Sequence, residues 1–82
     1  MKRLAIYCVT YHSYNELYRF LQSVEEAALR VSSSLTVDVY VADNTDSQIQ
    51  PVSDSCSACH LKVFQLMHNW GYFGAIQKML KQ

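Results

Sequence analysis

At 82 residues the chain is short for a domain, since domains most often have about 100–150, so residues 1–82 are interpreted as one unit and a second domain is excluded. Apolar residues make up 50% of the sequence and charged residues 17%, which excludes a disordered chain. The formal net charge is zero and the Lys and Arg residues are scattered, which argues against nucleic acid as a partner.

Residues 4–9 form a continuous apolar run, which is typical of a central parallel strand covered on both faces. Lys2 and Arg3 precede this run, as in a secretory signal, but a signal core needs about 7–15 apolar residues and no cleavage site follows. No stretch has the length of a membrane span, so membrane association is not indicated. We therefore expect a cytoplasmic protein in which the thiols of Cys8, Cys56 and Cys59 are reduced.

Ser13 and Glu16 have the spacing of a capping box, which predicts a helix that begins at Tyr14. Apolar residues then recur every three or four positions as far as Val31, so one face of this helix is expected to be buried. Three serines end the helical pattern at residues 32–34.

β-Branched and aromatic residues at 36–42 predict a second strand, and the polar segment 43–59 predicts a long loop. Residues 61–66 are interpreted as a third strand. A last helix follows, with an apolar face formed by Phe73, Ile76, Met79 and Leu80.

This order predicts an α/β fold, with a three-stranded parallel sheet in the order 3-2-1 and two helices, equivalent to half of a doubly wound domain. In that order residues 4–9 lie at an edge of the sheet, and an exposed apolar edge is a liability. We therefore expect either a truncated piece of a larger domain or self-association through the exposed sheet edge.

Polar residues follow each predicted strand: residues 10–12, residues 43–46 and the glycine-containing loop 68–75. The carboxyl ends of parallel strands meet at one edge of a sheet, and open α/β folds bind ligands there. A nucleotide-type site is therefore the leading hypothesis. It also requires that Asp43 lie close to Thr10 and Gly71.

Each of these features has a structural alternative, which the sequence leaves open. Asp43 can form a turn with nearby backbone amides instead of binding a ligand. Gly71 and Gly74 can permit a left-handed turn and close helix packing instead of close approach to a phosphate. His12 and His68 are interpreted as solvated or structural histidines.

Cys56, Cys59 and His60 match the pattern by which haem is attached to c-type cytochromes. Haem attachment needs an export route and an axial ligand, and a zinc site of paired thiolates needs a second ligand pair. The segment is therefore interpreted as a loop that carries two thiols.

The chain resembles the N-terminal part of the family 2 glycosyltransferases, which have the GT-A fold and use nucleotide-diphosphate sugars. The resemblance lies in the strand that ends at residues 9–11 before a helix with Glu16, the strand that ends at residues 41–45, and the loop at residues 69–75. Their order and spacing agree over nearly the whole chain. His12, Gln77 and Met79 depart from the family pattern.

The resemblance implies a Rossmann-like GT-A domain in which Thr10, Tyr11 and Asp43 contact the donor nucleoside, Asp43 through the base. It implies that Asn69, Gly71 and Gly74 shape the same pocket. The family's Asp-x-Asp motif, its divalent cation (Mg or Mn) and its catalytic base belong to a later part of the family's sequence, so we assign no catalytic or metal residue and expect no sugar transfer by these 82 residues.

The sequence leaves two other functions open. One is a non-catalytic α/β module that acts through protein contacts; its closest form, a signalling receiver, needs an acidic pair after the first strand, where Thr10, Tyr11 and His12 stand here. The other is an electron carrier that uses Cys56 and Cys59. It is disfavoured because the sequence offers no export route or axial ligand for haem and no second ligand pair for zinc.

Overall fold

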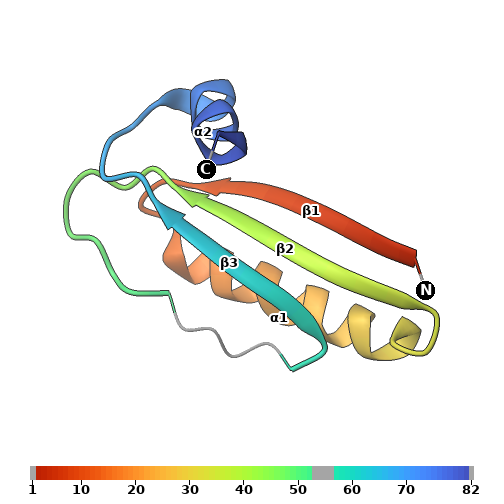
Figure 1. Cartoon of the computed structure of the whole chain (residues 1–82). Coiled ribbons are helices and arrows are strands. Elements are labelled where there is room, and N and C mark those ends of the chain that lie inside the picture. Colours follow the sequence, from red (N-terminus) through yellow and green to blue (C-terminus); the bar gives the residue numbers. More distant parts are fainter. Residues whose placement is uncertain (1, 53–56, 82) are drawn as a thin grey trace.

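The chain folds in the order β1 (Lys2–Thr10), α1 (Tyr14–Val31), β2 (Leu35–Asp43), β3 (Cys59–Gln65) and α2 (Gly71–Leu80), as shown in Figure 1. The structure is a computed structural model and describes residues 2–52 and 57–81. The three strands form one parallel sheet in which β2 lies between β1 and β3. The predicted α/β class and strand order are confirmed.

The central strand β2 supplies most of the buried sheet surface. Val37, Val39 and Val41 point to one face, where they pack against buried residues of α1 such as Leu17 and Leu21. On the other face a smaller cluster joins Ala42 of β2 to Ala75 and Met79 of α2. The sheet is thus covered by α1 on one face and by α2, near the strand ends, on the other (Figure 1).

The first strand differs from its prediction as a central strand, because β1 pairs only with β2 in the described part of the chain. Leu4 and Tyr7 are 46% and 42% exposed. The apolar side chains of β1 do contact other elements: Ile6 packs against the core beneath α1, and the Tyr7 ring stacks on the Tyr40 ring with 5.0 Å between their centres. An apolar sequence pattern therefore indicates buried side chains, but it does not indicate whether the backbone of the strand is paired on both edges.

Helix α1 begins at Tyr14 as predicted, but the prediction of a capping box by Ser13 and Glu16 is wrong. The Ser13 hydroxyl donates to the carbonyl of Tyr11 at 3.0 Å, and no side chain caps the helix. The first helical bond is instead from the Leu17 amide to the Ser13 carbonyl, at 2.9 Å. The capping box does not form because the Ser13 hydroxyl bonds to the nearby Tyr11 carbonyl instead of to an amide of the first helical turn.

In the predicted loop 43–59, the described residues 44–52 and 57–58 form no helix or strand, while residue 43 belongs to the end of β2 and residue 59 to the start of β3. Strand β3 begins at Cys59, earlier than the predicted start at residue 61, because Cys59 pairs in register with Val37 and is buried. Over residues 2–52 and 57–81, no helix combines the length and apolar character of a membrane span.

Two leucines of α1 test the assignment of the core. Leu21→Ala, at a buried position, is expected to lower the free energy of unfolding by about 2–5 kcal/mol. Leu29→Ala is the matched control, because Leu29 is 57% exposed, and we expect a change below about 0.5 kcal/mol. Urea denaturation followed by circular dichroism measures both. Equal losses would show that α1 is docked on a different face.

Candidate site at the carboxyl ends of the strands

The ends of the three strands meet at one edge of the sheet. Thr10 is the register partner of Asp43, and the amide of Asn44 donates to the Thr10 carbonyl at 2.8 Å. The amide of Leu66, just after β3, donates to the Asp43 carbonyl at 2.9 Å. The side-chain amide of Asn44 then donates to the Gly71 carbonyl at 3.1 Å, so the expected proximity of Thr10, Asp43 and Gly71 is present.

Asp43 is held inside the protein rather than projecting from it. The residue is 1% exposed, and its carboxylate accepts two hydrogen bonds, from the Tyr14 hydroxyl at 2.8 Å and from the Thr45 amide at 3.0 Å. The second bond closes the local turn that the sequence left open as the structural alternative. Each oxygen can accept a further hydrogen bond, but because the residue is buried, a base can reach the carboxylate only after local movement of the residues that cover it.

Tyr14 is a site residue that sequence reasoning missed. Besides donating to Asp43, its hydroxyl accepts from the amide of Gln50 at 3.1 Å. One phenol therefore joins the start of α1, the end of β2 and the loop that follows. Its only sequence signal is its place in the first turn of a helix that follows a strand end, since 29 residues separate it from Asp43.

Two polar side-chain atoms in this region are buried and have no hydrogen-bond partner among the described residues. They are Oγ1 of Thr10 and Oδ1 of Asn44, in residues that are 5% and 2% exposed. Buried polar atoms are nearly always bonded in folded proteins. The candidate site thus retains hydrogen-bonding capacity that its own side chains do not use.

The loop after β1 presents the accessible part of the site. His12 has a left-handed backbone, with φ of 51°, and its amide donates to Oγ1 of Thr45 at 3.0 Å. Its Nε2 lies 3.2 Å from Oδ1 of Asp46, and this hydrogen bond is the main reason why the pKa of Asp46 is lowered. Tyr11 is 43% exposed and meets the His12 ring edge-on at 4.5 Å.

The two glycines of the third segment each have a structural reason. Gly71 has a φ of +70°, and its amide donates to the side-chain oxygen of Asn69 at 3.1 Å. A Cβ at Gly74 would lie 3.1 Å from Cβ of Trp70, so Gly74 permits the close approach of the first side-chain atom of Trp70. Trp70 lies beneath the ammonium of Lys78, 4.2 Å from the ring centre, and beside His68.

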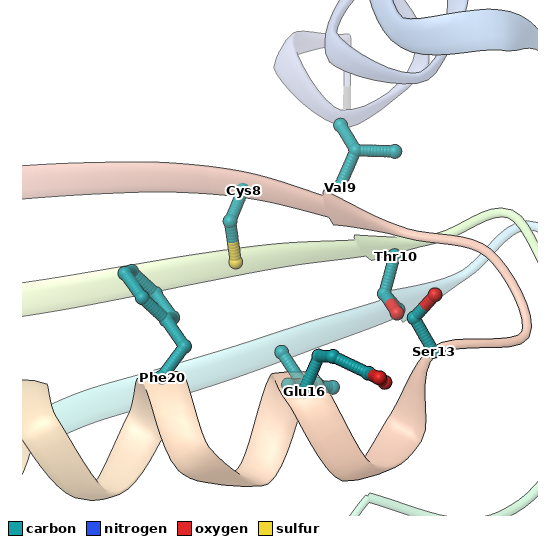
Figure 2. Close-up of a pocket in the computed structure, with 7 residues that line it drawn as sticks. Cys8, Val9, Thr10, Ser13, Glu16 and Phe20 are labelled. Atoms are coloured by element: carbon teal, nitrogen blue, oxygen red, sulfur yellow. The ribbon is translucent and has the colours of Figure 1, made fainter.

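A small hollow adjoins the site where β1 passes over α1 (Figure 2). Its volume is about 160 Å³, well below the roughly 300–1,000 Å³ of drug-sized ligand pockets, so it fits a fragment of a ligand at most. Figure 2 shows the Thr10 and Ser13 hydroxyls at one end and the Cys8 thiol beside the Phe20 ring at the other. Burial raises the pKa of Cys8 to about 11, so this thiol stays protonated and is no nucleophile at neutral pH.

The Cys-x-x-Cys-His segment does not form a described site. Cys56 lies outside the described residues, and Cys59 is not in the predicted loop but buried at the start of β3, in the α1 cluster. His60 follows it on the strand and is exposed. Within residues 2–52 and 57–81 no three His, Cys, Asp or Glu side chains are placed to hold a metal ion.

Comparison of the chain with models of known protein families, with curated proteins and with solved structures found no match. Function is therefore inferred from the residues of this chain and from their geometry.

The link between Tyr14 and Asp43 gives a stability prediction. Tyr14→Phe leaves a buried carboxylate oxygen without its donor, and we expect a loss of about 1.5–3 kcal/mol in the free energy of unfolding. Tyr18→Phe, on the same helix, is the control, since the Tyr18 hydroxyl makes only an exposed 3.4 Å bond and should change stability by less than about 0.5 kcal/mol. Urea titration of both variants decides the matter, and a neutral Tyr14→Phe contradicts the assigned network.

The pair of His12 and Asp46 gives a titration prediction. The pKa of Asp46 is lowered in the folded protein, so the bond stabilises the fold at neutral pH and its contribution fades as the pH falls below about 4. In His12→Ala the pKa of Asp46 should rise towards its ordinary value, because the largest cause of the lowering is removed. Carboxyl NMR titration measures this directly. An unchanged pKa in the variant rules out His12 as the cause.

Proposed function

We propose that the chain is the donor nucleotide-binding part of a glycosyltransferase with the GT-A fold, an enzyme that moves a sugar from a nucleotide-diphosphate sugar to an acceptor hydroxyl. One observation carries the proposal: Thr10, Asp43 and Gly71, which belong to three segments far apart in the sequence, meet at the carboxyl edge of a parallel sheet. Ligands of open α/β sheets bind at that edge.

The exposed and buried groups suggest different roles in nucleotide binding. Tyr11, whose ring is 43% exposed, offers a face on which a base can stack. Asp43 offers a carboxylate oxygen, which can accept a further hydrogen bond, to a ring N–H of the base. Because Asp43 is 1% exposed, the base reaches it only after local movement, so the affinity of the isolated chain for nucleotide should be modest.

The proposal concerns binding rather than sugar transfer. The family resemblance assigns the divalent cation, Mg or Mn, to an Asp-x-Asp motif, and the 82 residues contain no such motif. The role assigned to Asn69, Gly71 and Gly74 is to shape the wall of the pocket. The hydrogen bond from the Gly71 amide to Asn69 and the close packing at Gly74 support this role, because they fix the backbone of the loop. The role does not require a direct bond from these residues to the ligand.

Nucleotide binding is tested by isothermal titration of the chain with UDP, GDP, CDP and ADP. We expect one of these to bind, and Asp43→Asn to weaken that binding at least about tenfold through loss of a hydrogen bond to a charged group. Asp38→Asn is the matched control: it lies on the same strand, pairs with Arg3 at 2.8 Å and should leave the affinity unchanged. Circular dichroism confirms that both variants are folded.

Two results would count against the proposal. One is the absence of heat with every nucleotide at millimolar concentration. The other is equal weakening by Asp43→Asn and Asp38→Asn, which would place the ligand away from the strand ends.

The alternative, a protein-interaction module, is favoured by one observation. Near and on α2, four large apolar side chains are exposed by 43% to 80%: Trp70, Tyr72, Phe73 and Leu80. Exposed apolar groups that gather on one element often mark an interaction surface. A chain that ignores nucleotides but self-associates or binds protein partners fits this alternative.

A further inference from the structure

The segments at the strand ends carry few charges, and histidine is their only basic residue type. Residues 10–13, 43–52 and 66–70 contain the acidic residues Asp43 and Asp46 and the basic residues His12 and His68, with no lysine or arginine. The diphosphate of a nucleotide-diphosphate sugar is anionic at neutral pH. The charge that this ligand meets at the strand ends therefore depends on whether the two histidines hold a proton.

His12 is held in place by the segment that follows β2. Its amide donates to Oγ1 of Thr45 at 3.0 Å, and Thr45 is fully buried. Its ring atom Nε2 lies 3.2 Å from Oδ1 of Asp46. The pKa of Asp46 is lowered, first by this hydrogen bond, so the carboxylate is ionised at neutral pH and can only accept. Nε2 is therefore the donor, and it carries a hydrogen even when the ring is neutral.

The other ring nitrogen of His12 is the atom that changes with pH. Among the described residues Nδ1 has no hydrogen-bond partner, and the side chain is 34% exposed. In a neutral ring whose Nε2 donates to Asp46, Nδ1 is an acceptor and cannot bond to a phosphate oxygen. Protonation turns Nδ1 into a donor and makes the ring positive. Imidazole side chains ordinarily change charge in this way between about pH 5 and 8.

The other titratable groups around His12 include one further base. The charge of a protonated His68, on the segment after β3, also lowers the pKa of Asp46, so both histidines lie within electrostatic range of one carboxylate. The remaining groups at the start of α1 and at the ends of β1 and β2 are acids or phenols: Tyr11, Tyr14, Glu16, Asp43 and Asp46. With neutral histidines the site is thus negative and repels a diphosphate.

We propose that protonated His12 binds the diphosphate of the donor through Nδ1, with His68 as a second positive charge, so that the site takes up a proton together with its ligand. The role rests on the proposed nucleotide binding and names a residue of the same site. Its position fits, because the His12 ring lies beside Tyr11, 4.5 Å between ring centres, and Tyr11 is the proposed platform for the base. His12 departs from the family pattern, so this role is not part of the resemblance.

The pH dependence has a definite sign. A ligand that prefers the protonated form of His12 increases the share of that form, so binding takes up protons from the solution. Affinity should be highest where histidines are charged and should fall as the pH rises from about 5.5 to about 8. One hydrogen bond to a charged group and one favourable charge pair predict a decrease of about 5- to 10-fold.

Isothermal titration of the chain with UDP-, GDP-, CDP- and ADP-glucose measures both effects. The diphosphate of these ligands does not titrate in this pH range, so any proton taken up is bound by the protein. The experiment is run at about pH 6.5, where an ordinary histidine is half protonated, in two buffers of different ionisation enthalpy. The difference in heat gives the protons taken up per ligand, and we expect clear uptake by the native chain.

His12→Asn removes the ring and keeps the backbone, because residue 12 has a φ of 51° and asparagine adopts this left-handed conformation readily. Proton uptake should fall to less than about half, and His68→Asn in addition should abolish it. His60→Asn is the matched control: it removes an exposed histidine on β3, the register partner of Asp38, and should leave uptake and affinity unchanged. Circular dichroism confirms that each variant is folded.

Asp46→Asn separates an electrostatic role from a structural one. The amide oxygen of asparagine still accepts from Nε2 of His12, while the negative charge is gone. At pH 8 the variant should bind the nucleotide sugar about 2- to 5-fold more tightly than the native chain, because less repulsion remains. A site that needs Asp46 only for its shape would bind more weakly instead.

The outcomes separate the role of His12 from nucleotide binding itself. Binding without proton uptake, or uptake that His12→Asn leaves unchanged, overturns the role of His12 and leaves the nucleotide site intact. Uptake that His60→Asn lowers as much as His12→Asn also overturns it. No binding of any of the four ligands, at pH 5.5 or at pH 8, overturns both.

Discussion

The structure depends on the central strand β2, which is paired on both edges and covered on both faces. Val39 and Val41 are fully buried against α1, and Ala42 is fully buried against α2. Because β2 is fixed by both neighbours, the residues that follow it, Asp43 to Thr45, are carried into the interior at the point where β1 and β3 also end. The candidate site is therefore a direct consequence of how the core packs.

The same residues serve folding and the proposed binding, and these two roles compete. Asp43 accepts bonds from Tyr14 and from the Thr45 amide and is 1% exposed, so a base that bonds to its carboxylate must first disturb the packed residues that stabilise the fold. Thr10 and Asn44, by contrast, carry buried atoms whose hydrogen-bonding capacity the described residues leave unused. A ligand can engage these atoms without losing an internal bond, although it needs local movement to reach them.

The sequence predicts what periodicity and composition determine, and it misses what depends on contacts between distant residues. The β-branched run of β2 and the helical period of α1 predicted these two elements correctly. The apolar run of β1 predicted a central strand, whereas β1 pairs only with β2 among the described residues, because hydrophobicity does not reveal pairing on the second edge. Ser13 was misread as a cap, because its hydroxyl has a nearer acceptor at Tyr11. No local pattern could link Tyr14 to Asp43.

The central claim is that a nucleotide binds where the three strands end, and chemical-shift mapping tests it most directly. Amide resonances of the ¹⁵N-labelled chain are recorded as UDP, GDP, CDP and ADP are added in turn. The account predicts saturable shifts that cluster at residues 10–12 and 43–46 with one nucleotide, and little change at the opposite ends of the strands, near Arg3 and Asp38. Shifts that cluster elsewhere, or none with any nucleotide, would contradict it.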